Sequence, residues 1–169
     1  DHDIGYLCPM LTRHETLTLA SPDATQQFAS ALARVLKMGD VVLLSGPIGA
    51  GKTHFARALI QSLLVVIEDV PSPSFTLIQT YEGPDFDLWH ADLYRLSSPD
   101  EVIELGLLEA FDQALTLVEW PDRLGDLQPR TALQIDLQQG NEDEHRIGHV
   151  TWQDMAWDSR LKELIDDWA

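Results

Sequence analysis

The sequence has one cysteine and few basic side chains. Because Cys8 stands alone among 169 residues, the chain can form no intrachain disulfide and no cysteine metal site. Eleven lysines and arginines stand against 28 acidic residues, which gives a formal net charge of −17. This balance disfavours free-standing nucleic-acid binding, which depends on basic side chains against phosphates. The net negative charge still permits a bound nucleotide. Salt screens charges that lie more than about 8 Å away, so the groups of the local loop determine nucleotide binding.

No apolar run approaches the roughly 18 residues that a membrane-spanning helix needs, and no signal peptide is evident. We therefore expect a cytoplasmic protein without a membrane partner. Internal repeats, low-complexity tracts and interdomain linkers are absent as well, so we assign residues 10–169 to a single domain. Residues 1–9 lack periodicity and precede Met10, and we expect them to be an added or disordered segment before the native start.

One stretch carries the pattern of a phosphate-binding loop. The apolar run 41–44 leads into G-x-x-x-x-G-K-[ST], and the apolar-periodic segment 55–60 follows it. In this order of strand, loop and helix, the glycines allow a tight turn whose N–H groups face phosphate oxygens. The pattern assigns Lys52 to the β- and γ-phosphates and Thr53 to Mg²⁺. The alternative is a glycine-rich turn that binds nothing. The expected nucleotide-binding residues of this stretch are Gly46, Ile48, Gly49, Ala50, Gly51, Lys52, Thr53 and His54.

Periodicity and turn residues predict an α/β order around this loop. Strands are expected at residues 15–20, 41–44, 76–81, 86–94, 115–118, 133–137 and 146–152. We expect the last two strands to form a C-terminal antiparallel hairpin. Helices are expected from the N-cap Ser21 to Gly39, from the loop to about Leu64, in short turns around Gly106, and over 158–169. The segment 65–70 is ambiguous.

Two carboxylates are candidates for the metal and catalytic side of a nucleotide site. Glu119 follows an apolar strand, and ligands in open α/β sheets bind beyond the carboxyl ends of strands, so we expect it near Thr53. The alternative is an ordinary strand-end carboxylate in solvent. Asp92 could orient the attacking water or complete the Mg²⁺ shell. Its alternative is a solvated residue on an alternating strand.

Two further features have both a functional and a structural interpretation. Ser72 and Ser74, which prolines flank, either form a loop that senses the γ-phosphate or make a rigid connection. Trp120 either stacks on a ligand or fills the core, and the core is the default expectation for such a residue.

As a set, four motifs resemble the TsaE family, also called YjeE. This family is the small bacterial ATPase needed to make threonylcarbamoyladenosine in tRNA. The motifs are Gly46–Thr53, Ser72–Phe75, His90–Arg95 and Glu119–Pro121, in that order. The resemblance covers most of residues 10–152.

The resemblance implies a P-loop NTPase-like α/β domain, with a mixed β-sheet flanked by helices, that binds ATP and Mg²⁺. It places Lys52 on the phosphates and Thr53 on the metal. Glu119 matches the metal-associated acid of the family. Asp92 and Trp120 match positions that the family needs for activity, so Lys52, Asp92 and Glu119 are the expected catalytic residues.

The resemblance also implies a switch-like loop and protein partners. Ser72, Ser74 and Phe75 match the switch segment. Ser74 stands where the family usually has threonine, so we expect retained function with a looser rotamer. Family partners are TsaD, which carries the transferase site, and TsaB. We therefore expect an ATP-hydrolysing accessory subunit that supports modification of the adenosine next to the anticodon by TsaD-like and TsaB-like subunits, and that meets tRNA only through them.

Two alternatives remain open at the level of the sequence. One is a small-molecule kinase of the P-loop class, which typically clamps the transferred phosphate with arginines from a mobile lid. Arg95, Arg123, Arg130 and Arg146 are scattered and form no arginine-rich lid segment. The other alternative is a nucleotide-dependent binding module with negligible turnover.

Overall fold

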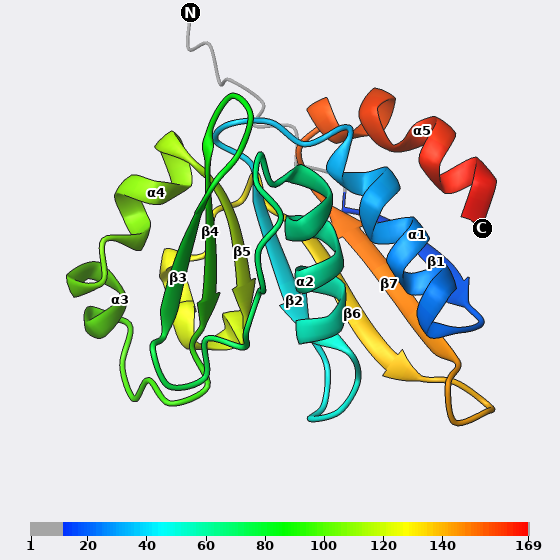
Figure 1. The fold of residues 1–169 in the computed structure, drawn as a ribbon, viewed down its shortest axis with the longest axis horizontal. Helices are drawn as coiled ribbons and strands as arrows, with labels where there is room; N and C mark the ends of the chain where they lie inside the picture. Colours follow the sequence, from blue (N-terminus) through cyan, green and yellow to red (C-terminus); the bar gives the residue numbers. More distant parts are fainter. Residues whose placement is uncertain (1–11, 169) are drawn as a thin grey trace, which may run out of the picture.

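The computed structural model describes residues 12–168, and all seven of its strands belong to one sheet (Figure 1). The strands are β1 (Arg13–Leu19), β2 (Val41–Ser45), β3 (Ile78–Glu82), β4 (Asp87–Asp92), β5 (Leu115–Glu119), β6 (Leu133–Gln139) and β7 (Arg146–Trp152). The helices are α1 (Pro22–Ala33), α2 (Lys52–Leu63), α3 (Asp100–Glu104), α4 (Leu107–Gln113) and α5 (Ala156–Trp168), with a 3₁₀ segment η1 (Pro121–Leu127). The expectation for residues 1–9 and Met10 lies outside the described residues, and the assignment of one domain stays a prediction.

The sheet is mixed, and its parallel part sets the place of the site. The strand order is β1-β7-β6-β2-β5-β4-β3. Strand β2 pairs in parallel with β5 and β6, and β4 pairs in parallel with β5. The remaining pairs are antiparallel, including the expected hairpin of β6 and β7. The carboxyl ends of β2, β4, β5 and β6 therefore meet at one edge of the sheet, where ligands bind in such folds.

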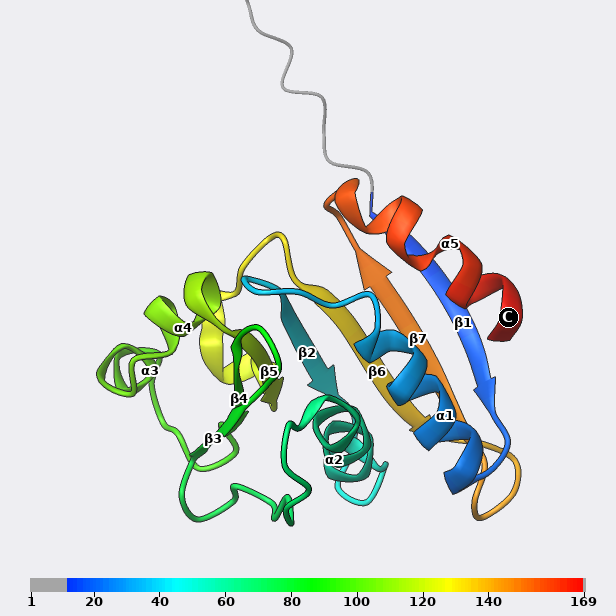
Figure 2. The same cartoon turned by 45° about the horizontal axis from the view of Figure 1, so that its top comes forward.

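Both faces of the sheet are covered by helices, as the expected fold class requires. Residues of β2 alternate between two apolar clusters, with Val42 and Leu44 in one and Val41 and Leu43 in the other. The first cluster includes α1, α2 and α5, and the views in Figures 1 and 2 show α1 and α2 side by side over β2, β6 and β7. The second cluster lies under α3, α4 and η1. A strand buried on both faces explains the continuous apolar run before the loop.

Helix α1 begins as expected but ends early. Ser21 is its N-cap, and the Ser21 hydroxyl accepts a hydrogen bond from Ala24 N at 3.1 Å. The helix ends at Ala33, so the expectation that it runs to Gly39 is wrong. Beyond it, the Val35 carbonyl accepts a hydrogen bond from Arg160 Nε at 3.0 Å. Because an α5 side chain satisfies this carbonyl, the chain can leave the helix there without an unpaired group.

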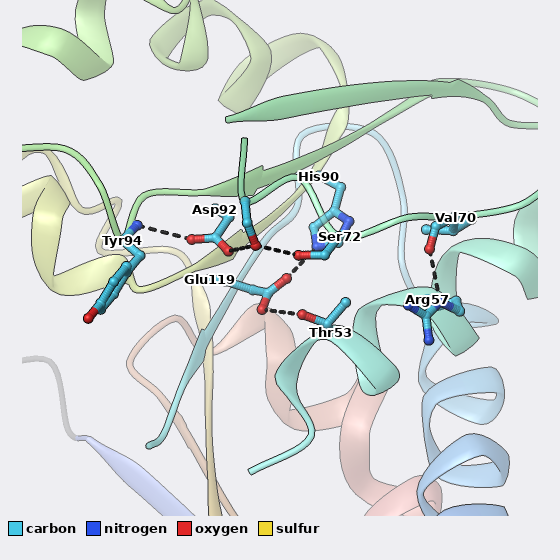
Figure 3. A network of polar contacts seen from close by, with 9 residues as sticks. Thr53, Arg57, Val70, Ser72, His90, Asp92, Tyr94 and Glu119 are labelled. Atoms are coloured by element: carbon cyan, nitrogen blue, oxygen red, sulfur yellow. Dashed lines mark hydrogen bonds and ion pairs between the residues drawn. The ribbon is translucent and has the colours of Figure 1, made fainter. Parts of the chain in front are cut away.

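The segment between α2 and β3 has no regular secondary structure, which settles the ambiguity at 65–70. Arg57 on α2 anchors this segment, because its Nε donates to the Val70 carbonyl at 2.9 Å (Figure 3). Strand β3 begins at Ile78, two residues later than expected. Leu77 has a φ of +67° and donates its N–H to the Pro73 carbonyl at 2.8 Å, so a turn occupies the expected strand start. Strand β4 is likewise shorter than the expected 86–94.

Among the described residues, no helix combines the length and the apolar content needed to cross a membrane.

Candidate functional site

The segment between β2 and α2 is a glycine-containing loop held closed by Lys52. Gly46, Gly49 and Gly51 all have positive φ angles, which only glycine adopts without strain. Lys52 Nζ donates to the carbonyls of Gly46 at 2.6 Å and Pro47 at 2.9 Å. The ammonium group therefore folds back over the loop that precedes its own helix.

Gly46 is also fixed by contact with the neighbouring strand. A Cβ atom at Gly46 would collide with the backbone carbonyl oxygen of Leu137 on β6. A Cβ atom at Gly49 would have no neighbour within 4 Å. Gly46, at a φ of +133°, is also farther than Gly49, at +81°, from the left-handed region that other residues can adopt, so Gly46 differs from Gly49 in both backbone strain and collision.

We expect Gly46→Ala to lower the free energy of unfolding by about 2–4 kcal/mol, because strain in φ and a backbone collision add. Gly49→Ala is the comparison variant, and it should cost about 1–2 kcal/mol, because a Cβ there meets no neighbour and its φ is nearer the left-handed region. Chemical denaturation of both variants measures the difference. Equal losses would show that neither the collision with Leu137 nor the more extreme φ of Gly46 carries an extra cost.

A cavity of about 410 Å³ opens at the helix end of this loop. Most of the expected site residues line it, from four separate segments of the chain. The expected residues on its wall are Ile48, Gly49, Gly51, Lys52, Thr53, His54, Ser74, Asp92, Glu119 and Trp120. Gly46, Ala50, Ser72 and Phe75 are not among its lining residues. Tyr94 and Arg95 line it as well.

Glu119 lies where the sequence predicts it, next to Thr53. Thr53 Oγ1 donates to Glu119 Oε1 at 2.8 Å, and His90 Nε2 lies 2.7 Å from Glu119 Oε2 (Figure 3). Glu119 is only 2% exposed, so the alternative of a strand-end carboxylate in solvent is wrong. The register explains the position, because Glu119 ends β5 opposite Leu44 of β2.

Asp92 is the second buried carboxylate of the cavity. It ends β4 directly opposite Glu119 and is 5% exposed, which excludes the alternative of a solvated strand residue. Its Oδ1 accepts from Tyr94 N at 3.0 Å, and its Oδ2 accepts from Ser74 Oγ at 3.3 Å. Ser74 Oγ lies 2.6 Å from Ser72 Oγ. The Ser72–Ser74 loop is therefore hydrogen-bonded to the carboxylate side of the cavity.

Phe75 points away from this network. Its side chain is 80% exposed, and the guanidinium carbon of Arg95 lies 4.4 Å from its ring centroid. Phe75 therefore covers an arginine of the cavity wall and does not itself line the cavity.

Trp120 stands on the cavity wall, so the default expectation of a core residue is wrong. Lys52 Nζ lies 4.2 Å from the Trp120 ring centroid, and the Tyr94 ring lies 4.9 Å from the same ring. Trp120 has a φ of +58°, which is uncommon for a bulky residue and marks strain at functional sites. This backbone turn directs the chain away from β5 immediately after Glu119.

Lys52 is 5% exposed, and its ammonium group experiences the charges of three carboxylates. Burial lowers the pKa of Lys52 from its ordinary value, and the negative charges of Glu119, Asp92 and Asp136 oppose this effect. The cavity therefore places the Lys52 and Arg95 side chains near the carboxylates of Asp92 and Glu119.

The donor atoms of the cavity fit a magnesium ion that is shared with a nucleotide. Among residues 12–168, no group of three or more His, Cys, Asp or Glu side chains is arranged to hold a metal ion by itself. The Thr53 hydroxyl and the carboxylates of Glu119 and Asp92 are hard oxygen ligands, which Mg²⁺ prefers. Mg²⁺ commonly takes one or two protein oxygens and completes its shell with phosphates and water, so this small donor set is sufficient.

Sequence reasoning missed two contacts of the site. His90 lies two residues before Asp92 on the same strand face, so the alternation of β4 was a usable signal. Arg146 Nε donates to the Ala50 carbonyl at 3.0 Å, and its Nη2 lies 3.4 Å from the Gly49 carbonyl. Arg146, the first residue of β7, therefore holds the loop in place, and no local sequence pattern predicts this contact.

The mixed sheet, with its glycine-containing loop between β2 and α2, places the protein in the class of P-loop NTPase-like α/β folds. Within that class, the chain belongs to the TsaE family. The family model described as "Threonylcarbamoyl adenosine biosynthesis protein TsaE" matches residues 19–147. This range contains all four motifs that carry the resemblance in the sequence.

Individual relatives agree with this assignment. The chain is 41% identical over 133 residues to the "tRNA threonylcarbamoyladenosine biosynthesis protein TsaE" of Rickettsia bellii, covering 79% of this chain and 92% of the relative. It is 38% identical over 128 residues to the Bacillus subtilis protein of the same name, covering 75% and 79%. The crystal structure of YdiB from Bacillus subtilis superposes with a TM-score of 0.74 at 28% identity, covering 93% of this chain and 97% of YdiB.

Proposed function

We propose that this protein binds ATP with Mg²⁺ at the phosphate loop and hydrolyses it, as an accessory subunit in the biosynthesis of threonylcarbamoyladenosine in tRNA. The contact of 2.8 Å between Thr53 Oγ1 and Glu119 Oε1 carries the proposal. It joins the first turn of the loop's helix to a buried carboxylate on the adjacent parallel strand. Membership of the TsaE family supports the biological context.

In this proposal, the loop and its helix hold the phosphates. The N–H groups at the start of α2 and the Lys52 ammonium group bind the phosphate oxygens. Thr53 and Glu119 hold the metal and its water shell. Magnesium, when bound, neutralises charge that develops on the phosphates.

Asp92 is suited to the hydrolysis step that follows ATP binding. Its carboxylate lies on the cavity wall, on the strand next to that of Glu119, and is fixed by Tyr94 N and Ser74 Oγ. A fixed carboxylate in this place can orient the attacking water and accept a proton from it. Because Ser74 contacts the same carboxylate, the Ser72–Phe75 loop is linked to the chemistry and suits the proposed switch role.

A second cavity of about 300 Å³ offers room for the nucleoside end. It shares Gly51 and His54 with the first cavity and lies against Glu144 of the β6–β7 turn and Arg146 at the start of β7. These residues follow β6, which flanks β2 on the side away from Glu119. A nucleotide whose γ-phosphate faces Glu119 can therefore extend across the start of α2 towards this second cavity.

The proposed partners are TsaD-like and TsaB-like protein subunits, and tRNA is met only through them. The proposed location is the cytoplasm. With 28 acidic and 11 basic side chains, the chain has few cations to neutralise phosphates, and Lys52 is assigned to the nucleotide.

We expect negligible tRNA affinity for the isolated chain at physiological salt, because each phosphate contact needs a basic side chain and weakens as salt rises. A salt series of tRNA binding, first with the chain alone and then with its partners, tests this. Specific low-micromolar binding by the chain alone at about 0.15 M salt would contradict the expectation and indicate a basic face.

Phosphate release with and without the partner subunits separates this function from its alternatives. An accessory ATPase releases phosphate from ATP, and we expect the partners to raise the rate. A small-molecule kinase would transfer phosphate to an acceptor and release little. A nucleotide-dependent binding module would bind ATP and release none in either condition.

A further inference from the structure

His90 is the most deeply buried ionisable side chain next to the candidate site. It lies on β4, is 0% exposed, and its Nε2 is 2.7 Å from Glu119 Oε2. No expected function of the site uses this side chain. The contact joins two adjacent parallel strands at the edge where the cavity opens.

The carboxylate of Glu119 is held at both oxygens. Oε1 accepts a hydrogen bond from Thr53, and Oε2 faces His90; Figure 3 shows Glu119 between these two side chains. A buried carboxylate that lacks one of its donors is free to turn about its last bond or to seek another partner. His90 and Thr53 together therefore fix the orientation of the carboxylate.

The surroundings of Nδ1, the other ring nitrogen of His90, indicate that the ring hydrogen is on Nε2 and points to Glu119. Nδ1 is shielded from solvent and has no hydrogen-bond partner among the described residues. With the hydrogen on Nε2, Nδ1 presents only a lone pair, whereas an unpaired N–H at this place would be costly. A neutral N–H donor at the Nε2 position is therefore sufficient for the contact.

We propose that His90 is a positioning residue, which holds the Glu119 carboxylate in the orientation that Thr53 and the Mg²⁺-bound nucleotide require. This inference rests on the proposed function. In this role His90 acts through Glu119 and contacts neither the nucleotide nor the metal. A histidine that only fills the core would support the fold without affecting how magnesium changes nucleotide affinity.

Two amide variants of equal polarity test the inference. Gln places its side-chain N–H₂ near the position of Nε2, whereas the shorter Asn places it near Nδ1 and cannot reach Glu119. The measurement is calorimetric titration with ATP, once with Mg²⁺ and once with EDTA. The ratio of the two affinities reports the contribution of magnesium, and it does not depend on turnover.

We expect His90→Asn to reduce this ratio about tenfold, the loss of one hydrogen bond to a charged group, with the affinity in EDTA unchanged. His90→Gln should restore most of the ratio. His90→Leu also removes the donor to Glu119, and it should reduce the ratio as much as His90→Asn does.

Thr116→Val is the matched control for a buried polar change in the same sheet. Thr116 lies on β5, is fully buried, and its Oγ1 donates to the Ala110 carbonyl at 3.3 Å, away from the cavity. This variant should lose stability and keep the wild-type ratio. Denaturation curves show which variants are folded under the titration conditions.

A wild-type ratio in folded His90→Asn or His90→Leu would overturn the inference and leave His90 a core residue. A loss in His90→Gln as large as in His90→Asn would also overturn it, because a neutral donor would then not suffice. If the wild-type protein itself binds no ATP, the proposed function fails first, and the two failures are distinct.

Discussion

Replacing Lys52 with alanine will lower the affinity for ATP–Mg²⁺ by about 100-fold or more, because two or more charge-assisted hydrogen bonds to phosphates are lost. Lys52 is the only lysine that lines the cavity among the residues that the structure describes. Lys52 is buried, and its ammonium nitrogen lies 4.2 Å from the Trp120 ring centroid. Calorimetric titration with ATP–Mg²⁺ measures the loss.

The variant also removes two hydrogen bonds to the loop, from Lys52 Nζ to the carbonyls of Gly46 and Pro47. Denaturation curves must therefore show that Lys52→Ala is folded. Lys162→Ala removes the same charge from the exposed surface of α5 and should bind ATP as the wild type does. Unchanged affinity in folded Lys52→Ala would contradict the assignment of the phosphate loop.

Replacing Glu119 with glutamine will slow single-turnover hydrolysis by about 100-fold and change ATP binding much less. The amide has the shape of the carboxylate but lacks the negative charge that orients Mg²⁺ and its water. One of its two polar groups becomes an N–H₂ donor, which the Thr53 hydroxyl can accept but which at His90 would face the Nε2 donor. The expected pattern is therefore a loss in rate that exceeds the loss in affinity.

Glu101→Gln is the control for this variant, because Glu101 is a carboxylate on α3 that does not line the cavity. It should hydrolyse ATP at the wild-type rate. If Glu119→Gln also has the wild-type rate, then Glu119 supports the fold and has no role in the chemistry.

The fold was predictable wherever a local pattern determines it. The strand before the loop is a continuous apolar run because β2 is buried on both faces, and the C-terminal hairpin alternates because its strands have one buried face. The ends of helices and strands were less predictable, because contacts with residues distant in the sequence contribute to where they lie. Arg160 donates to the Val35 carbonyl just beyond the end of α1, and these two residues lie 125 positions apart.

The candidate site likewise combines residues that a local sequence pattern predicts with residues that only the folded chain brings together. Lys52 and Thr53 follow from the loop pattern, and Glu119 follows from its place at the end of an apolar strand. His90 stands within a motif that the sequence already indicates, but its partner is 29 residues away and on another strand. Arg146 reaches the Ala50 carbonyl across 96 residues, and only the folded sheet brings the two together.

The most direct test of the proposed function is reconstitution of tRNA modification from TsaD-like and TsaB-like partners, tRNA and ATP, with and without this chain. Threonylcarbamoyladenosine is measured in the recovered tRNA. The proposed function predicts sustained modification with the wild-type chain, and little when the chain is omitted or replaced by Lys52→Ala. Equal modification in all three reactions would contradict it.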